Sequence, residues 1–308
     1  MKILVTGGGG FIGSCVCSHM IEKGYEVHTI DNLSTGYKEN IPQKVKFIQG
    51  DCSDAIITKK LDADYQAILH IAGQSSGEIS FDSPEIDLKS NTLSTLNLLN
   101  FAKQIKCKKF IYASTMSVYG DVEDRKINEE DLTKPLSMYA VGKLASENYL
   151  KIFSNLNIEP VSLRLFNVYG PGQNLENLKQ GMVSIFLAQA IKNNEIVVKG
   201  KPDRFRDLVY IDDVVHVFDY FLHDYQYKKF ENFNICSGKK TEVGALLKKI
   251  IELLKKEITV KFTKGTPGDQ FGIYGDNSKF MSLVKDFRFT DIDEGLKKFI
   301  DSVNNEEF

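Results

Sequence analysis

The sequence predicts an α/β fold, in which a doubly wound sheet of parallel strands is followed by a smaller α/β lobe at the C-terminal end. Short apolar runs alternate with longer amphipathic stretches through the first 165 residues. These runs are uninterrupted, as in strands that are covered on both faces. A glycine cluster follows the first run. The repeated order of strand, helix and strand indicates right-handed crossovers between parallel strands.

The expected strands of the main sheet are six apolar runs, at residues 3–6, 27–31, 45–49, 67–71, 110–114 and 161–165. Amphipathic helices are predicted over 11–23, which Gly24 ends, and over 91–103. After Asn167 we expect helices over 182–192, 241–255 and 292–303, a strand over 195–199, and a loop over 262–276. The predicted domains are 1–166, to which a segment near 205–235 returns, and a substrate lobe of 167–204 and 236–308.

Composition excludes several classes of function. The 39 basic and 41 acidic residues are evenly spread, so the basic face that nucleic-acid binding needs is missing. No apolar run reaches the roughly 20 residues that cross a bilayer, and no signal-peptide pattern opens the chain. The five cysteines are scattered and form no CxxC pair, which argues against a disulfide framework or a zinc site. We therefore expect a cytoplasmic protein without a metal, a nucleic-acid partner or a membrane anchor.

A glycine-rich segment, residues 6–13, joins the first predicted strand to the first helix. Gly7 permits a tight turn, Gly10 lets the backbone approach a pyrophosphate, and Gly13 lets the helix pack close to the strand. The helix N-terminus adds N–H donors and partial positive charge. Asp31 lies eighteen residues after Gly13, where a carboxylate binds the adenosine 2′-hydroxyl and repels a 2′-phosphate. The pattern predicts a Rossmann-type site that prefers NAD to NADP.

Tyr139 and Lys143 are spaced i and i+4 in a predicted helix, so that the phenol and the ammonium face one site. Lowering a tyrosine pKa of about 10 by about three units takes roughly 4 kcal/mol. One ammonium about 4 Å away, at an effective dielectric constant near 20, supplies about that much. The pair suits removal of a proton from a sugar or alcohol hydroxyl while a hydride leaves the same carbon. Thr115, after the fifth strand, is expected to hydrogen-bond the reacting oxygen, and the alternative is a simple strand-end turn.

These motifs occur together in an order that resembles one family. The matching segments are 6–13, Asp31-Asn32, Gly50-Asp51, 115–120, Tyr139 with Lys143, 164–171 and 206–213. They resemble the extended short-chain dehydrogenase/reductase family, and within it the NAD-dependent nucleotide-sugar epimerases and dehydratases of the UDP-glucose 4-epimerase-like group. The resemblance covers nearly the whole chain. It implies a Rossmann sheet, a nucleotide-diphospho-sugar substrate, a setting in polysaccharide precursor synthesis, and a homodimer formed through helices at about 87–103 and 139–153.

The resemblance also implies roles for individual residues. The residues expected to bind NAD are Gly7, Gly10, Phe11, Ile12, Gly13, Asp31, Asn32, Asp51, Cys52, Ile71, Ala72, Gly73, Asn91, Tyr139 and Lys143. The residues expected to be catalytic are Thr115, Tyr139 and Lys143. The residues expected to bind the substrate are Thr115, Asn167, Arg206 and Asp269. Arg206 is one of only five arginines in the chain, and its guanidinium suits a bidentate grip on the diphosphate.

Two segments depart from the family pattern. Family dehydratases follow the equivalent of Thr115 with Asp-Glu, whereas this sequence has Met116 and Ser117. These two side chains cannot exchange a proton at neutral pH, so a 4,6-dehydratase is not expected. A late Arg-Pro-Gly-Asp motif begins here with Thr266, so a phosphate-binding arginine is missing.

The leading hypothesis is an NAD-dependent nucleotide-sugar 4-epimerase, which removes a hydride from sugar C4 and returns it to the other face of the 4-keto sugar. One alternative is a net dehydrogenase of a nucleotide-diphospho-sugar, such as a GDP-sugar, that releases the 4-keto product. Another is a non-catalytic dinucleotide-binding sensor.

Overall fold

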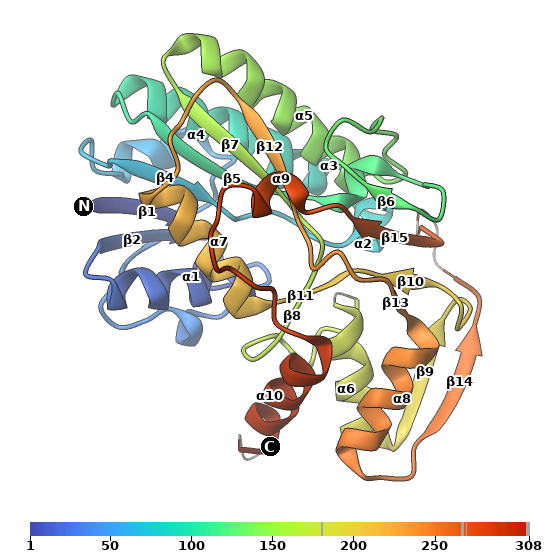
Figure 1. The fold of residues 1–308 in the computed structure, drawn as a ribbon. Coiled ribbons are helices and arrows are strands. Elements are labelled where there is room, and N and C mark those ends of the chain that lie inside the picture. The colour runs from blue at the N-terminus through green and yellow to red at the C-terminus, as the bar shows by residue number, and fades with distance from the viewer. Residues whose placement is uncertain (180, 266–267, 269, 306–308) are drawn as a thin grey trace.

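A seven-stranded sheet forms the centre of the larger lobe in the computed structural model, which describes residues 1–179, 181–265, 268 and 270–305 (Figure 1). The strand order is β12-β7-β5-β4-β1-β2-β3, and every neighbouring pair is parallel. The strands are β1 (Lys2–Thr6), β2 (Glu26–Asp31), β3 (Lys46–Gln49), β4 (Ala67–His70), β5 (Lys109–Thr115), β7 (Glu159–Leu165) and β12 (Glu231–Ile235). The predicted doubly wound parallel fold is confirmed.

Both faces of the sheet are covered by helices. Ile3 and Val5 of β1 pack in the apolar cluster that contains α1 (Phe11–Glu22) and α7 (Ile211–His223). Leu4 between them belongs to the opposite cluster, with α4 (Ser94–Gln104) and α5 (Met138–Phe153). Figure 1 shows these two helix pairs on opposite sides of the sheet. Because neither face meets water, the strands carry continuous apolar runs, which is why the sequence reveals them.

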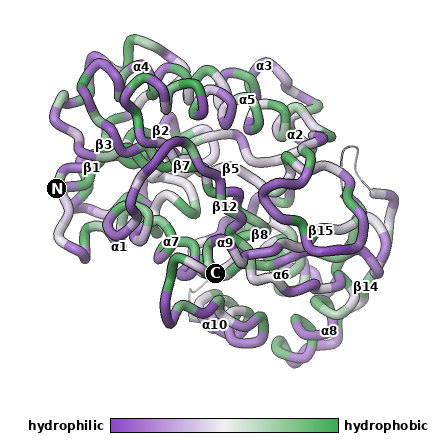
Figure 2. The backbone as a smooth tube through the Cα atoms, turned by 45° about the horizontal axis from the view of Figure 1, so that its top comes forward, coloured by the Kyte–Doolittle hydropathy of each residue, from purple (hydrophilic) through white to green (hydrophobic). Residues whose placement is uncertain are grey.

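A smaller lobe lies beside the carboxyl ends of the strands (Figure 1). Its helices are α6 (Met182–Asn193), α8 (Val243–Leu254) and α10 (Ile292–Asn305). Its parallel strand pair is β9 (Glu195–Lys199) with β14 (Thr259–Thr263). Figure 2 shows hydrophobic and hydrophilic residues alternating along α8, as expected of a helix with one face on a core.

Two small sheets join the lobes. The first contains β13 (Thr241–Glu242), β10 (Phe205–Arg206), β15 (Gly272–Gly275) and β6 (Lys126–Ile127), in that order. The second pairs β11 (Leu208–Tyr210) with β8 (Asn167–Tyr169). The short α-helices are α2 (Gly77–Asp82), α3 (Pro84–Asp87) and α9 (Ser278–Met281). Short 3₁₀ or π-helical segments, η1 to η5, lie at Lys38–Asn40, Ala55–Lys60, Leu88–Leu93, Met116–Tyr119 and Ser154–Leu156. Strand β12 comes from the segment near 205–235 and lies in the main sheet, and the domain boundaries themselves stay a prediction.

Three predicted elements differ from the structure. The helix expected over 91–103 is preceded by a π-helical turn, η3, and its regular part begins at Ser94. The helix expected over 241–255 begins at Val243, because the two residues before it pair with β10. The loop expected over 262–276 contains β15, where a Cβ on Gly272 would lie 2.3 Å from the Phe205 ring. Gly272 therefore lets this strand pack against an aromatic side chain from a distant segment.

Helix α5 is attached to the sheet through one buried carboxylate. Glu147 accepts hydrogen bonds from Ser114 Oγ of β5 at 2.6 Å and from Ser162 Oγ of β7 at 3.1 Å. It also accepts one from Arg164 Nη2 at 2.7 Å, and the side chains of this ion pair are each 4% exposed. Removing one partner of such a pair leaves the other charge buried without compensation.

The substitution Glu147→Gln should lower the free energy of unfolding by about 3 to 5 kcal/mol, because the Arg164 guanidinium keeps its charge in a buried site. Urea denaturation followed by circular dichroism measures the change. The control is Glu159→Gln on β7, the strand that also carries Arg164. Glu159 forms a partly exposed ion pair with Lys108 at 3.8 Å, and this pair should contribute less than about 1 kcal/mol to the free energy of unfolding. Equal effects of the two substitutions would contradict the importance of the buried pair.

Candidate active site

The loop between β1 and α1 lies against the end of β4. Gly7 has a φ of +81°, and a Cβ there would lie 2.8 Å from the Ala72 backbone nitrogen. A Cβ on Gly13 would lie 2.0 Å from the Gly7 carbonyl oxygen. Helix α1 begins without a side-chain cap and without an acidic residue in its first turn. These features leave a tight glycine cradle and a bare helix N-terminus, which fit a pyrophosphate. The cradle holds the predicted residues Gly7, Gly10, Phe11, Ile12 and Gly13.

The acidic residues predicted for the adenosine side lie beside this loop. Asp31 Oδ2 accepts a hydrogen bond from the Gly9 backbone N–H at 2.9 Å. Asp51 Oδ2 accepts one from Asn32 Nδ2 at 3.0 Å. The Cys52 side chain is buried in the apolar core. The structure thus brings Asp31, Asn32 and Asp51 to one side of the cradle, where their roles toward a nucleotide stay predictions.

The end of β4 forms the other wall of the crevice. The Ile71 backbone N–H donates to Thr6 Oγ1 at 3.1 Å. A Cβ on Gly73 would lie 2.4 Å from Asn91 Oδ1 and 3.4 Å from Lys143 Nζ, so only glycine fits between these two side chains. Asn91 Oδ1 is buried and has no hydrogen-bond partner among the described residues. An unsatisfied buried acceptor at this place is consistent with a ligand that donates a hydrogen bond to it.

The three predicted catalytic residues meet where β5 ends. Thr115 is the last residue of β5, and Tyr139 lies in the first turn of α5, which the Ser137 side chain caps. The Thr115 hydroxyl lies close enough to the Tyr139 hydroxyl to act on the pKa of the phenol. Lys143 Nζ donates to the Ala113 carbonyl at 2.9 Å and lies 6.0 Å from the centroid of the Tyr139 ring. All three side chains are buried. The spacing of Tyr139 and Lys143 therefore does bring both groups to one site.

Burial dominates the protonation of this site. Burial raises the pKa of Tyr139 to about 12, although the nearby Thr115 hydroxyl acts in the opposite direction. Burial lowers the pKa of Lys143 to about 8, although the Asp87 carboxylate raises it. Burial therefore outweighs the lowering of the Tyr139 pKa that the sequence predicts from Lys143, whose ammonium lies 6.0 Å from the centroid of the Tyr139 ring and 4.9 Å from that of Tyr112. The phenol needs a further positive charge before it can act as a base near neutral pH.

A cavity of about 290 Å³ lies beside the catalytic residues and is lined by both lobes. Met116 and Ser117 line it directly after Thr115. Thr115 Oγ1 donates to Ser117 Oγ at 3.2 Å. Neither a thioether nor a serine hydroxyl ionises near neutral pH, so neither serves there as a general acid or base. This part of the cavity wall therefore lacks the acid and base that removal of water from a sugar requires.

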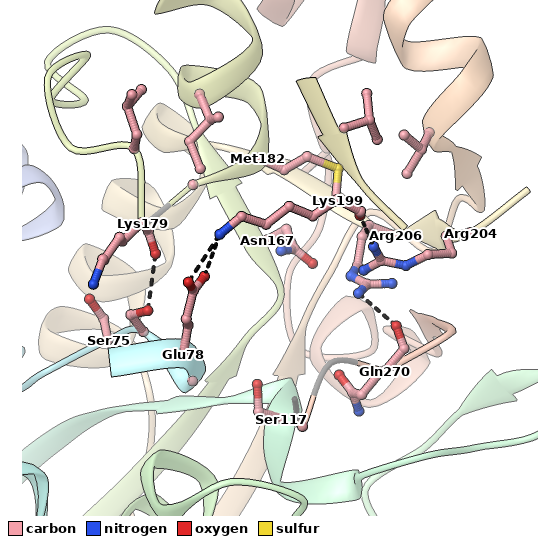
Figure 3. A pocket seen from close by; sticks show the side chains of 18 of the residues that line it. Ser75, Glu78, Ser117, Asn167, Lys179, Met182, Lys199, Arg204, Arg206 and Gln270 are labelled. Carbon is pink, nitrogen blue, oxygen red and sulfur yellow. Dashed lines mark hydrogen bonds and ion pairs between the residues drawn. The ribbon is translucent and has the colours of Figure 1, made fainter. Parts of the chain in front are cut away.

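Two predicted substrate ligands line the same cavity, and Figure 3 shows them in one view. Asn167 begins β8, and its Oδ1 is buried without a hydrogen-bond partner among the described residues. Arg206 ends β10, and its Nη2 donates to the Gln270 carbonyl at 2.8 Å. Another predicted substrate ligand, Asp269, lies outside the described residues. The structure brings Asn167 and Arg206 together, and their contact with a diphosphate stays a prediction.

Three side chains at the site were not predicted from the sequence. Asp87 is 1% exposed and accepts hydrogen bonds from Asn91 Nδ2 at 3.0 Å and Gln74 Nε2 at 2.9 Å. Glu78 and Lys199 form an ion pair in the cavity. The i and i+4 spacing of Asp87 and Asn91 in the sequence could have revealed the hydrogen bond between these two side chains. No local signal connects Glu78 with Lys199, because 121 residues separate them.

Comparison with known proteins shows the class to which this fold and site belong. Residues 3–236 match the NAD dependent epimerase/dehydratase family, and the chain belongs to this family. A putative UDP-glucose 4-epimerase of Methanocaldococcus jannaschii is 34% identical over 98% of each chain. The UDP-glucose 4-epimerase of Thermotoga maritima, solved with UDP-glucose, has a TM-score of 0.93 and 31% identity over 99% of each chain. The Thermus thermophilus enzyme, solved with NAD, has a TM-score of 0.91 and 29% identity over the whole of both chains.

The predicted family and Rossmann fold are confirmed by these comparisons, and so is NAD as the cofactor of the family. The glycine cradle and the unsatisfied Asn91 acceptor fit that cofactor. Across the described ranges, no helix combines the length and the apolar character that a membrane span requires.

The buried Lys143 should make stability depend on pH. Its pKa falls from 10.5 to about 8 on folding, so between these values the unfolded chain binds more protons and stability rises with pH. Lys143→Met lacks this contribution. The free energy of unfolding of the variant minus that of the wild type should therefore fall by about 3 kcal/mol as the pH rises from 7 to 10.5. Urea denaturation across this pH range measures both free energies of unfolding. If the difference between variant and wild type did not change with pH, a buried ammonium at position 143 would be excluded.

Proposed function

We propose that this protein is an NAD-dependent 4-epimerase of UDP-linked sugars. The observation that carries the proposal is the meeting of Thr115, Tyr139 and Lys143 at the end of β5, between the glycine cradle and the cavity between the lobes. The names of similar structures support the substrate class. They include a UDP-glucuronic acid 4-epimerase from Bacillus cereus and a UDP-N-acetylglucosamine 4-epimerase from Methanobrevibacter ruminantium, each 28% identical to this chain.

In this proposal Tyr139 removes the proton of the sugar C4 hydroxyl, and the Thr115 hydroxyl hydrogen-bonds the same oxygen. Bound NAD, which the glycine cradle would hold, would supply the hydride acceptor and donor for C4 and a positive charge near the phenol. Lys143 supplies a second positive charge near the phenol. After the sugar has presented its other face, Tyr139 gives the proton back to the same oxygen, so that protons and hydride balance over the cycle.

The substrate would be held away from the reacting carbon. Arg206 and Asn167 bind the diphosphate in the cavity. The sugar can then rotate and present its other face while the nucleotide stays bound. A guanidinium suits this task because its planar N–H donors match two phosphate oxygens. Elimination of water from the sugar needs an acid and a base, and Met116 and Ser117 provide neither at this wall of the cavity. This supports an epimerase over a 4,6-dehydratase.

Tyr139→Phe should lower turnover by about 10²- to 10⁴-fold, as expected for loss of a general base, while the affinity for NAD stays unchanged. NMR of UDP-glucose, UDP-glucuronic acid and UDP-N-acetylglucosamine measures inversion at C4, and calorimetry measures NAD binding. Tyr149→Phe, on the same helix, is the matched control and should retain full turnover. Turnover of the Tyr139 variant within tenfold of the wild type would remove this residue as the base.

The product distinguishes the proposed epimerase from the alternatives. NAD-loaded protein is mixed with a panel of UDP-, GDP-, CDP- and dTDP-sugars, and the absorbance of reduced nicotinamide is followed with NMR of the sugar. An inverted sugar without lasting reduced nicotinamide is the expected result. A lasting signal with a released ketone indicates a dehydrogenase, and the absence of any change across the panel indicates a dinucleotide-binding sensor.

We also propose that two copies of the chain associate through α3, η3 and α5. These elements pack beside one another, and they carry the exposed apolar side chains Ile86, Leu88, Val141 and Ile152. Exposed apolar side chains gathered on adjoining helices are typical of an interface between protein chains. A second copy of the same face would cover them symmetrically.

The double substitution Leu88→Glu and Val141→Glu should convert a dimer into a monomer, because it places charges on the proposed apolar interface. Light scattering coupled to gel filtration measures the mass. The control is Leu132→Glu, which changes an exposed leucine outside these helices and should leave the dimer intact. A wild-type chain that elutes with the mass of one copy would contradict the proposed dimer.

A further inference from the structure

One ion pair spans the cavity between the lobes. Lys199 ends β9, Glu78 lies in the first turn of α2, and the lysine Nζ lies 2.9 and 3.0 Å from the two carboxylate oxygens. Figure 3 shows the lysine side chain extended along the cavity, with Glu78 at its tip and Arg204 and Arg206 near its base. The pair therefore lies in the space that a molecule bound beside Arg206 would enter.

The charges around the cavity are unequal. Among the described residues that line it, Glu78 is the one acidic side chain, and four are basic: Lys179, Lys199, Arg204 and Arg206. The wall thus favours an anion. In this setting the Glu78 carboxylate opposes an incoming anion, and the Lys199 ammonium neutralises that carboxylate. An anion that draws Lys199 toward itself gains a cation but leaves Glu78 unpaired.

The backbone of Lys199 is held in place, whereas its ammonium can move. Arg204 Nη1 donates to the Lys199 carbonyl, which keeps the backbone of Lys199 beside the two arginines. The Lys199 side chain is 48% exposed and that of Glu78 is 32% exposed. Partly exposed ion pairs contribute little to stability, because water competes with each partner. Rotation of the lysine side chain is therefore enough to carry its ammonium from Glu78 back toward the arginine end of the cavity.

We propose that Lys199 is a substrate-binding residue that exchanges the Glu78 carboxylate for the diphosphate of the nucleotide-sugar. The proposal rests on the proposed function, which makes a diphosphate the anion that enters the cavity. Two adjoining phosphates carry more charge than one carboxylate and so compete for the ammonium. Glu78, on the first turn of the short helix α2 and itself 32% exposed, then turns toward solvent. The Glu78 carboxylate thus competes with the ligand for the Lys199 ammonium, and a weakly charged or uncharged ligand does not take its place.

Opposite effects of substituting the two partners test this exchange. The dissociation constant of UDP is measured by calorimetry for the wild type, Lys199→Met and Glu78→Gln. Lys199→Met should weaken UDP binding by about tenfold, and Lys199→Arg should restore most of it. Glu78→Gln should tighten UDP binding by about threefold or more, because the competing carboxylate is gone. Uridine, which lacks the diphosphate, should bind all variants with the same affinity within about twofold. Thermal denaturation checks that each variant is folded.

The matched control is Asp82→Asn on the same helix. Asp82 pairs with Lys179 of the other lobe at 3.5 Å, but it does not line the cavity. This substitution removes an ion pair between the lobes, and because the pair is exposed and its carboxylate lies outside the cavity, it changes the charge that an entering anion meets less than Glu78→Gln does. It should leave the dissociation constant of UDP unchanged within about twofold.

Other outcomes overturn the inference. If the Glu78–Lys199 pair only ties the lobes together, both substitutions shift the affinity for UDP in the same direction. An equal response of uridine and UDP also contradicts a contact with the diphosphate. Failure of the wild type to bind UDP contradicts the proposed function instead, and inorganic pyrophosphate then serves as the probe. Weaker pyrophosphate binding by Lys199→Met supports the exchange, and equal binding excludes it.

Discussion

The geometry of the candidate active site depends on one buried ion pair, that of Glu147 with Arg164. Tyr139, Lys143 and Glu147 recur every four residues along α5 and so share one face of the helix. Glu147 accepts a hydrogen bond at 2.6 Å from Ser114, the residue before the threonine that ends β5. The contact that fixes the helix on the sheet thus also sets where the phenol lies relative to that threonine. Apolar packing around it stabilises the helix but does not by itself specify this register.

The same network reaches the substrate lobe. Arg164 Nη1 donates to the Tyr119 hydroxyl at 2.9 Å, and this hydroxyl donates to Asn234 Oδ1 of β12 at 2.6 Å. Asn234 Nδ2 in turn donates to the Ile127 carbonyl of β6 at 2.8 Å. Strand β6 belongs to the small sheet that also contains β10 and Arg206. A continuous series of buried polar contacts therefore connects the residues proposed for chemistry with those proposed to bind the diphosphate, so both halves of the site share one frame.

The main sheet and the dinucleotide cradle could be predicted from the sequence, because continuous apolar strands and a glycine loop followed by Asp31 are local patterns. The smaller lobe could not be predicted in detail, because its strands depend on distant partners. Gly272, for example, lies in a strand because this segment pairs with the distant strand β10, and only a glycine leaves room there for the Phe205 ring. The Glu78–Lys199 pair is equally invisible to any local pattern. The pKa of the catalytic phenol is set by burial, which residue spacing alone does not reveal.

The most direct test of the proposed 4-epimerase uses UDP-sugars that carry deuterium at C4, incubated with the NAD-loaded protein in ordinary water and followed by NMR. The expected product has inverted configuration and keeps deuterium at C4, because the hydride leaves and returns within one closed site. Loss of the deuterium to solvent, or release of a ketone without inversion, would contradict the proposed 4-epimerase.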